Sequence, residues 1–270
     1  MTDMSKLTPE EWWHGMLTGE NPEFPLRRIR SLLKLLPEGP RCKFCNAPFH
    51  GFGAPLMRMM GQYPSRLTPH LCAQCHKHAS QHLGGAEVEL TMLFADIRGS
   101  TSLAEKMSPT EFGQLISRFF SVAADIVVRS QALLDRLVGD QVIGLYIPGF
   151  AGENHRELAI SAARELLRVT GHSSPPGPWI PIGVGIHTGI AFVGSVGNAG
   201  VATDITVLGD AANTAARLSS SAKAGEVLVS ENAMIPSLIS ENLESRSLEL
   251  KGKSQPVKVF VLSENLLPQS

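Results

Sequence analysis

Two runs of β-forming residues, 132–138 and 141–147, are separated only by Gly139 and Asp140. A two-residue Gly-Asp link between such runs predicts a tight hairpin. The two strands must therefore be antiparallel neighbours in one sheet. This restricts the fold more strongly than any other feature of the sequence.

The segments around the hairpin complete an alternating order of strands and helices. Ser108, Pro109 and Glu111 supply the N-cap, the first-turn proline and the capping-box acid of a helix. The order strand–helix–strand–strand–helix–strand predicts an α+β domain with the ferredoxin-like plan, a mainly antiparallel sheet with helices on one face. The other predicted elements are strands at 87–97 and 180–193 and helices at 108–127 and 154–169.

A C-terminal αβ extension follows the predicted ferredoxin-like core. It contains strands at 205–208, near Val227 and at 257–262, and a helix at 210–218. The predicted organisation is a helical segment (1–40), a cysteine module (41–85) and a main domain (87–265).

Residues 10–36 carry apolar and basic residues at helical spacing, interrupted by Pro22 and Pro25. We expect two short helices, because proline breaks a helix interior. A helix packed on its own protein is favoured over a membrane-surface or partner-binding helix, because a basic amphipathic stretch alone is a weak signal.

The formal net charge is −1, and Lys and Arg are scattered. No basic stripe is present that would neutralise nucleic-acid phosphates, so no nucleic-acid partner is predicted. No apolar leader and no run of about 18 apolar residues occurs, so we predict no transmembrane segment and a cytoplasmic protein.

The four cysteines form two Cys-x-x-Cys pairs, Cys42 with Cys45 and Cys72 with Cys75. This pattern predicts a tetrahedral Cys₄ site with one Zn²⁺ ion per chain. An iron–sulfur cluster uses the same thiolates and stays open, as does a role for His76 and His78 as ligands or neighbours. The remaining alternative is four buried free thiols.

Two carboxylates occupy the ends of predicted strands, Asp96 after the first strand and Asp140 in the hairpin turn. If those strands are neighbours, the carboxylates meet at one edge of the sheet and can hold two divalent cations for an in-line phosphoryl displacement. Taken singly, each aspartate is better explained as a turn residue.

In the predicted helix at 210–218, Asn213 and Arg217 are four residues apart and project from one face. An amide and a guanidinium together offer several donors to phosphate and sugar oxygens. The alternative is an exposed polar helix face.

Three segments resemble the signature blocks of class III nucleotidyl cyclases, and two shorter ones resemble that family as well. In chain order they are 93–101 (LFADIRGST), 136–140 (RLVGD), 185–189 (GIHTG), 207–217 (VLGDAANTAAR) and 250–253 (LKGK). Several motifs in the right order, spread over about 87–262, are far more specific than one motif alone.

The resemblance implies a head-to-tail homodimer acting on a nucleoside triphosphate, with two Mg²⁺ or Mn²⁺ ions per site. It implies that Asp96, Ile97 and Asp140 of one subunit form the metal site and that Phe94 contributes to substrate binding. From the other subunit, Asn213 orients the ribose and Arg217 stabilises the triphosphate. Lys251 or Lys253 then adds a phosphate contact.

In the resembled family, base choice depends on the positions that are Arg136 and Thr206 here. Adenylyl cyclases usually carry Lys with Asp or Thr, and guanylyl cyclases Glu with Cys. A cationic residue with a hydroxyl favours ATP, although the planar fork of Arg is not equivalent to Lys, which leaves GTP or relaxed selectivity open.

The sequence therefore predicts a cyclase that converts ATP to 3′,5′-cyclic AMP and pyrophosphate. The alternatives are a guanylate or relaxed-specificity cyclase and a catalytically silent homologue that senses nucleotide or metal. The cysteine module is interpreted as a structural or regulatory metal module.

Overall fold

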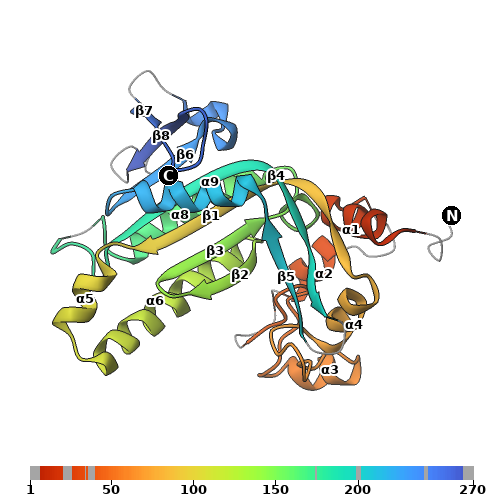
Figure 1. Ribbon diagram of the computed structural model, residues 1–270. Coiled ribbons are helices and arrows are strands. Elements are labelled where there is room, and N and C mark those ends of the chain that lie inside the picture. Colours follow the sequence, from red (N-terminus) through yellow and green to blue (C-terminus); the bar gives the residue numbers. More distant parts are fainter. Residues whose placement is uncertain are drawn as a thin grey trace. The chain divides into compact units, whose positions relative to one another are not determined.

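The computed structural model describes residues 7–20, 26–33, 35, 40–173, 175–198, 202–239 and 243–263. By their internal contacts these residues form two compact units, and we describe each by itself (Figure 1). The first unit consists of Met1–Glu89, Ile147–Glu153 and Ile190–Gly209, and the second of Leu90–Tyr146, Asn154–Gly189 and Asp210–Ser270. The three-part domain division drawn from the sequence stays a prediction.

The ferredoxin-like core is confirmed by the order of its elements and strands. The sheet order begins β2-β3-β1-β4, and α6 and α8 pack on each other and on the β2–β3 hairpin. The elements are β1 (Gly84–Ile97), α6 (Pro109–Arg129), β2 (Leu133–Val138), β3 (Gln141–Tyr146), α8 (His155–Val169) and β4 (Ile182–Asn198). β1 begins at Gly84.

The C-terminal extension adds strands beyond β4, giving the order β4-β6-β8-β7. Its elements are β5 (Ala202–Leu208), α9 (Asp210–Ser221), β6 (Glu226–Ser230), β7 (Ser245–Leu248) and β8 (Val257–Ser263). β6 runs parallel to β4, whereas β5 pairs antiparallel with β4 off the main order. Two single-turn 3₁₀ helices, Glu231–Ala233 and Pro236–Leu238, connect β6 to the segment before β7.

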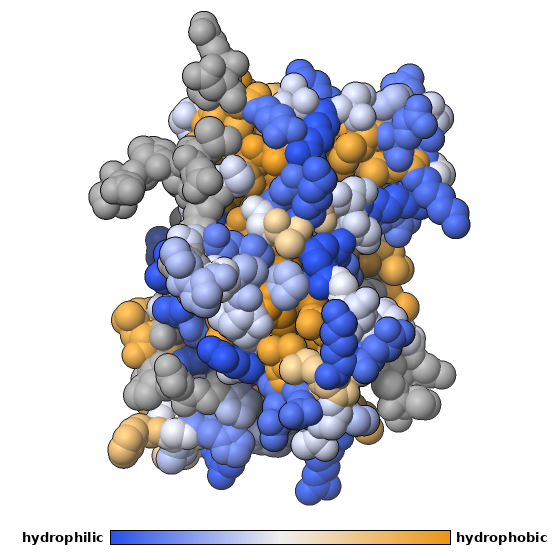
Figure 2. All heavy atoms as spheres, turned by 90° about the vertical axis from the view of Figure 1, so that its left-hand side faces the viewer, coloured by the Kyte–Doolittle hydropathy of each residue, from blue (hydrophilic) through white to orange (hydrophobic). Residues whose placement is uncertain are grey.

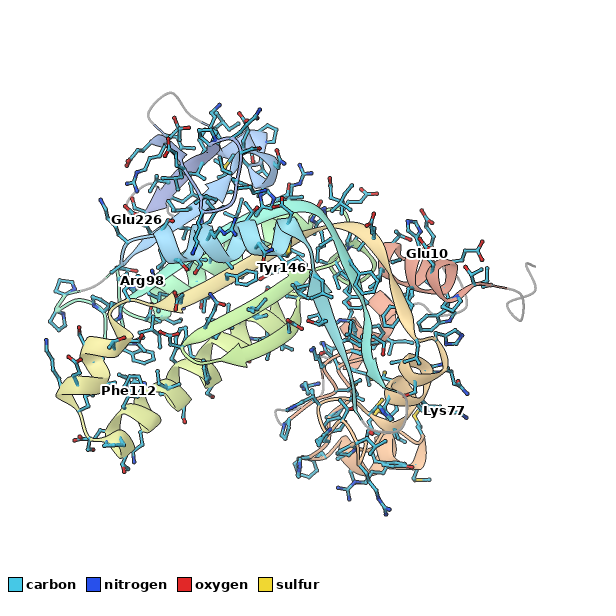
Figure 3. The ribbon with its side chains drawn as sticks, in the orientation of Figure 1. Glu10, Lys77, Arg98, Phe112, Tyr146 and Glu226 are labelled. Carbon is cyan, nitrogen blue, oxygen red and sulfur yellow. The ribbon has the colours of Figure 1, made fainter. Side chains whose placement is uncertain are left out.

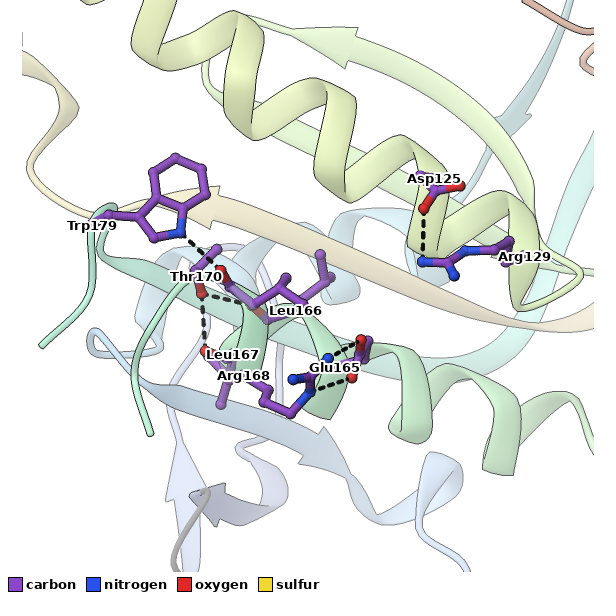
Figure 4. A network of polar contacts seen from close by, with 9 residues as sticks. Asp125, Arg129, Glu165, Leu166, Leu167, Arg168, Thr170 and Trp179 are labelled. Atoms are coloured by element: carbon purple, nitrogen blue, oxygen red, sulfur yellow. Dashed lines mark hydrogen bonds and ion pairs between the residues drawn. The ribbon is translucent and has the colours of Figure 1, made fainter. Parts of the chain in front are cut away.

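Local capping explains where the helices of the second unit begin and end. Ser108 and Glu111 form the predicted capping box at the start of α6. At the end of α8, Thr170 Oγ1 donates to the Leu166 carbonyl at 2.6 Å and Trp179 Nε1 donates to the Val169 carbonyl at 2.8 Å (Figure 4). The Trp179 bond satisfies a carbonyl in the last turn of the helix, whereas the Leu166 carbonyl also accepts from the Thr170 amide. Helix α5 (Ser100–Lys106) was not predicted, and its N-cap, Gly99, makes no side-chain capping bond.

Glycines on β4 let α9 approach the strand closely. A Cβ on Gly185 would lie 2.2 Å from Ser219 N and 2.6 Å from Ala215 O, and a Cβ on Gly183 would lie 2.8 Å from Ala222 O. Those neighbours are backbone atoms, which cannot turn aside as a flexible side chain can. The glycines in this part of β4 therefore set the position of α9.

We predict that Gly185→Ala lowers the free energy of unfolding by roughly 3 kcal/mol, because the added methyl group forces α9 away from β4. Urea unfolding of the purified protein measures this loss. Gly113→Ala is the matched control, since Gly113 lies in α6 with open space around its Cα. It should stabilise the protein by about 0.5–1 kcal/mol through helix propensity. Equal stability of Gly185→Ala and the wild-type protein would contradict the packing argument.

The first unit contains α1 (Pro9–Thr18), α2 (Leu26–Leu33), α3 (Ala54–Met59), α4 (Ala73–Gln81) and α7 (Pro148–Ala151). Trp12 and Trp13 of α1 are buried, Trp12 stacks on His82 with ring centroids 4.3 Å apart, and Trp13 Nε1 donates to the His82 carbonyl at 2.7 Å. The expectation that this helix packs on its own protein is therefore confirmed for α1.

None of the helices among the described residues is long and apolar enough to cross a membrane. On the face drawn in Figure 2, hydrophilic and hydrophobic residues are interspersed.

Candidate active site and metal centre

The two predicted metal-binding carboxylates lie side by side in the second unit. β1 and β3 are antiparallel neighbours, and Asp96 is opposite Gln141, the residue that follows Asp140. The Ile97 amide donates to the Asp140 carbonyl at 3.3 Å, which joins the end of β1 to the hairpin turn. Gly139 adopts a φ of 62°, which glycine tolerates, and this lets the turn be only two residues long.

Arg98 is a neighbour of this pair that the sequence did not single out. Its guanidinium forms an ion pair with Asp96 and donates to the Ser220 carbonyl of α9 at 2.9 Å (Figure 3). Burial raises the pKa of Asp96; the charge of Arg98 opposes this and the neighbouring Asp140 adds to it. A carboxylate in this position favours a cation, because a cation relieves both the burial cost and the repulsion.

Phe94 and Ile97 flank Asp96 on β1 and are buried, at 4% and 2% exposure. Phe94 is paired with Ile143 of β3.

Asn213 and Arg217 lie on the outward side of α9. Asn213 is exposed and Arg217 half-buried, whereas Thr214, Ala215 and Leu218 face inward and are buried. The predicted common face is therefore present, and the inner face of α9 packs on β4 and β6.

The 250–253 turn lies beside α9 and adds positive charge to it. Gly252, with a φ of 76°, would bring a Cβ to 3.3 Å from a terminal nitrogen of Arg217. Lys253 forms an ion pair with Asp210 at the start of α9, and Lys251 is exposed. The structure thus places Gly252 of this turn beside Arg217 and Lys253 beside Asp210.

His187, in the GIHTG segment, was not assigned a role from the sequence. Its Nδ1 is 2.8 Å from the Ser230 hydroxyl. Burial lowers its pKa to about 4, the charge of Lys253 contributes to the decrease, and Asp210 opposes it. At neutral pH the imidazole of His187 is therefore uncharged, and it lies near the charges of Asp210 and Lys253.

We predict that His187 makes the protein less stable as the pH falls from about 6.5 to 4, since the unfolded chain takes up a proton that the folded chain resists. The loss amounts to at most about 3 kcal/mol over this range. His187→Gln should flatten that part of the curve of unfolding free energy against pH, and the control His14→Gln should not. An unchanged slope in His187→Gln would contradict the assignment.

The two positions expected to select the base lie in different units. Arg136 lies on β2 between Leu134 and Leu137, where the register of the pairing with β3 shifts. Thr206 lies on β5 opposite Gly194 and is 7% exposed. Each is therefore placed within its own strand.

The four cysteines of the first unit converge as predicted. Their sulfurs all lie within 4.8 Å of one another, and Cys45 Sγ is 3.8 Å from Cys72 Sγ. Sulfurs bound at about 2.3 Å around a tetrahedral Zn²⁺ ion are about 3.8 Å apart, so the geometry fits zinc. His76 Nε2 instead lies 3.4 Å from the Ser80 hydroxyl, and His78 stacks on Trp12, so neither belongs to the sulfur cluster.

Backbone amides around the cluster favour thiolates at Cys42 and Cys72, but not at all four cysteines together without a cation. The Cys72 amide donates to Cys42 Sγ at 3.2 Å, and the Cys75 amide donates to Cys72 Sγ at 3.4 Å. The neighbouring sulfurs, Cys42 first, raise the pKa of Cys45 and of Cys75, so a cation is needed to hold all four as thiolates. The buried Arg30 donates to the Lys43 and Phe44 carbonyls of the first knuckle; burial lowers its pKa to about 10, and the cysteines counteract this.

We predict that the purified protein carries about one zinc per chain and that Cys42→Ser loses it, because three thiolates and a hydroxyl bind zinc less tightly. Chelation should make residues 41–82 sensitive to limited proteolysis, since the ion supplies much of this segment's folding energy.

Added Zn²⁺ should restore protection in chelated wild-type protein but not in Cys42→Ser. A brown protein containing iron would indicate a cluster instead. If proteolysis of the metal-free protein were unchanged, the alternative of four buried free thiols would be favoured.

A carboxylate pair at a strand edge and a helix face that carries a guanidinium are groups that phosphoryl transfer uses. Residues 86–264 match the family described as adenylate and guanylate cyclase catalytic domain. The chain therefore belongs to this family, and the resemblance to class III nucleotidyl cyclases is confirmed.

Similar proteins come from both branches of the family. An adenylate cyclase of Anabaena cylindrica is 29% identical over 188 residues, covering 63% of this chain and 36% of that protein. The guanylyl cyclase Cya2 superposes with a TM-score of 0.57 at 27% identity, over 66% of this chain and 93% of that one. The adenylyl cyclase CyaB of P. aeruginosa superposes with a TM-score of 0.54 at 28% identity, over 65% of this chain and 93% of that one.

An uncharacterised protein of Mycobacterium tuberculosis is 30% identical over 182 residues, which is 66% of this chain and 33% of that protein. The chain thus spans about a third of the length of these curated relatives.

Proposed function

We propose that this protein is a nucleotidyl cyclase that converts ATP to 3′,5′-cyclic AMP and pyrophosphate. The observation that carries the proposal is that the register of β1 and β3 sets Asp96 opposite Gln141, next to Asp140, in a chain of the cyclase family. We further propose that it acts in the cytoplasm, where its triphosphate substrate is available.

The carboxylates of Asp96 and Asp140, with the Ile97 backbone, would hold two Mg²⁺ or Mn²⁺ ions. Bound there, the ions would lower the pKa of the 3′ hydroxyl and neutralise the leaving pyrophosphate. In the reaction, the 3′ oxygen loses its proton and forms a bond to the α-phosphorus, while the bond from that phosphorus to the bridging oxygen of pyrophosphate breaks.

The exposed face of α9 would bind the rest of the substrate. Asn213 is free to donate to the ribose, and Arg217 can make two parallel bonds to phosphate oxygens. Lys253, held beside α9 by Asp210, and Lys251 would add charge on the same side. Positive charge that is already in position stabilises the transition state without further reorganisation.

A site shared between two subunits is favoured by the position of these groups along α9. Arg98, two residues after Asp96, contacts Ser220 near the end of α9. Asn213 is seven residues earlier, which is about 10 Å along a helix axis. We therefore propose a head-to-tail homodimer, in which the partner subunit supplies Asn213 and Arg217 to the carboxylate pair.

ATP is proposed as the substrate on the chemistry of Arg136 and Thr206. A buried hydroxyl on β5 can accept a hydrogen bond from the adenine amino group. The similar structures include adenylyl and guanylyl cyclases, so they do not distinguish the bases. GTP is therefore the alternative that the assay must include.

We predict that purified protein with Mn²⁺ forms cyclic AMP from ATP faster than cyclic GMP from GTP. Asp96→Asn should reduce turnover at least a hundredfold, because the amide removes a charged metal ligand while keeping its size. Asp125→Asn is the matched control: Asp125 forms an exposed ion pair with Arg129 on α6 (Figure 4), and its loss should leave turnover unchanged.

Mixing Asp96→Asn with Asn213→Ala protein should restore part of the activity, since a heterodimer keeps one intact shared site. Heterodimers that form but stay inactive would count against the shared site. No product from either nucleotide, with the fold intact, would indicate the catalytically silent alternative.

A further inference from the structure

The cysteine module carries a concentrated apolar surface that the proposed reaction does not use. Six of the thirteen exposed large hydrophobic residues among the described residues fall within residues 52–67. Phe52 is 94% exposed, Met59 87% and Leu56 57%. We call this set the apolar patch; it consists of Phe52, Leu56, Met59, Met60, Tyr63 and Leu67.

The residues of the apolar patch are not part of the hydrophobic core. α3 already buries its inner residues, Ala54 and Met57, so its outward side chains have no core position to fill. Backbone hydrogen bonds fix the chain around the patch. The Ala73 amide donates to the Tyr63 carbonyl at 2.8 Å, and the Ser65 amide donates to the Leu71 carbonyl at 2.9 Å.

The patch is also bounded by metal-binding residues. Residues 52–67 connect the Cys42–Cys45 knuckle to the Cys72–Cys75 knuckle, whose sulfurs converge. The patch therefore lies on the chain between two knuckles whose sulfurs come together. Exposed hydrophobic residues clustered in this way mark an interaction surface.

The charge of the module selects the kind of partner. Residues 39–86 contain no Asp or Glu but five basic residues, whereas the whole chain has a formal net charge of −1. Arg58 and Arg66 lie within the patch segment and are exposed, as is Lys77 of α4 (Figure 3). Even with Zn²⁺ bound to four thiolates, a dianionic unit, the module stays positively charged. Its partner should be both anionic and apolar.

We propose that the apolar patch docks this protein on an anionic lipid bilayer surface. Phe52, Leu56 and Met59 enter the acyl boundary while Arg58 and Arg66 bind lipid headgroups, a division that amphipathic membrane-binding surfaces use. A nucleic-acid platform would interleave several aromatic residues with the charges, whereas this patch is mainly aliphatic. The proposal is independent of the cyclase activity.

The test is co-sedimentation of the full, zinc-loaded chain with phosphatidylcholine vesicles, with and without 30% phosphatidylserine. We expect at least tenfold stronger partition onto the vesicles that contain phosphatidylserine. Phe52→Ser with Met59→Ser should weaken this partition about tenfold or more, because two exposed apolar anchors are lost. Arg58→Gln with Arg66→Gln should weaken it by a similar factor and remove most of the lipid selectivity.

The matched control is Ile239→Ser with Lys106→Gln, which changes one exposed apolar and one exposed basic residue outside the module and should leave partition unchanged. Zinc content and thermal midpoint are measured for every variant, so that loss of fold is distinguished from loss of binding. In Phe52→Trp protein, quenching of the new tryptophan by brominated lipid should report insertion.

Several results would overturn the proposal. They are equal partition of the Phe52/Met59 variant and the wild-type protein, no partition onto vesicles with phosphatidylserine, and patch-dependent binding to polyglutamate or duplex DNA without binding to vesicles. The last result would assign the patch to an acidic protein or nucleic-acid partner instead.

Discussion

The proximity of two like charges, Asp96 and Asp140, depends on the register of β1 against β3. A slip of one residue would turn Asp96 to the opposite face of the sheet. The bond from the Ile97 amide to the Asp140 carbonyl and the two-residue turn at Gly139 hold the register at this point. The fold therefore maintains a repulsion that Arg98 only partly offsets, and a divalent cation is the ligand that relieves it best.

The cationic side of the candidate site depends on close packing rather than on charge. α9 can approach β4 because Gly183 and Gly185 carry no Cβ, and Gly252 similarly lets Arg217 approach the 250–253 turn. Small residues thus determine where Asn213 and Arg217 project. This explains why a helix with a polar outward face has an inner face of alanine, threonine and serine with one leucine, since bulkier residues would hold it away from the strand.

The sequence predicts those parts whose signals are local. The hairpin, the capping box of α6 and the common face of α9 each follow from a few adjacent residues. The contact of Arg98 with Ser220 of α9, the register shift around Arg136 and the position of His187 are tertiary, and no spacing rule reports them. α3 and α4 were missed because the cysteine cluster orders a segment that is too short and irregular to show a helical period.

The cysteine module also contacts a strand of the cyclase domain. Lys43, between two cysteines of the first knuckle, donates from its ammonium group to the Ile205 carbonyl on β5 at 2.9 Å. α4 packs on the same strand, in which Thr206 directly follows Ile205. The chain itself joins the module to the domain at Gly84 and Gly85, and this contact is a second connection. Loss of the metal should therefore affect the strand that carries Thr206 first, while the Asp96–Asp140 pair keeps its own strand pairing. Binding of the base and binding of the catalytic metals are thus expected to respond to the state of the module to different degrees.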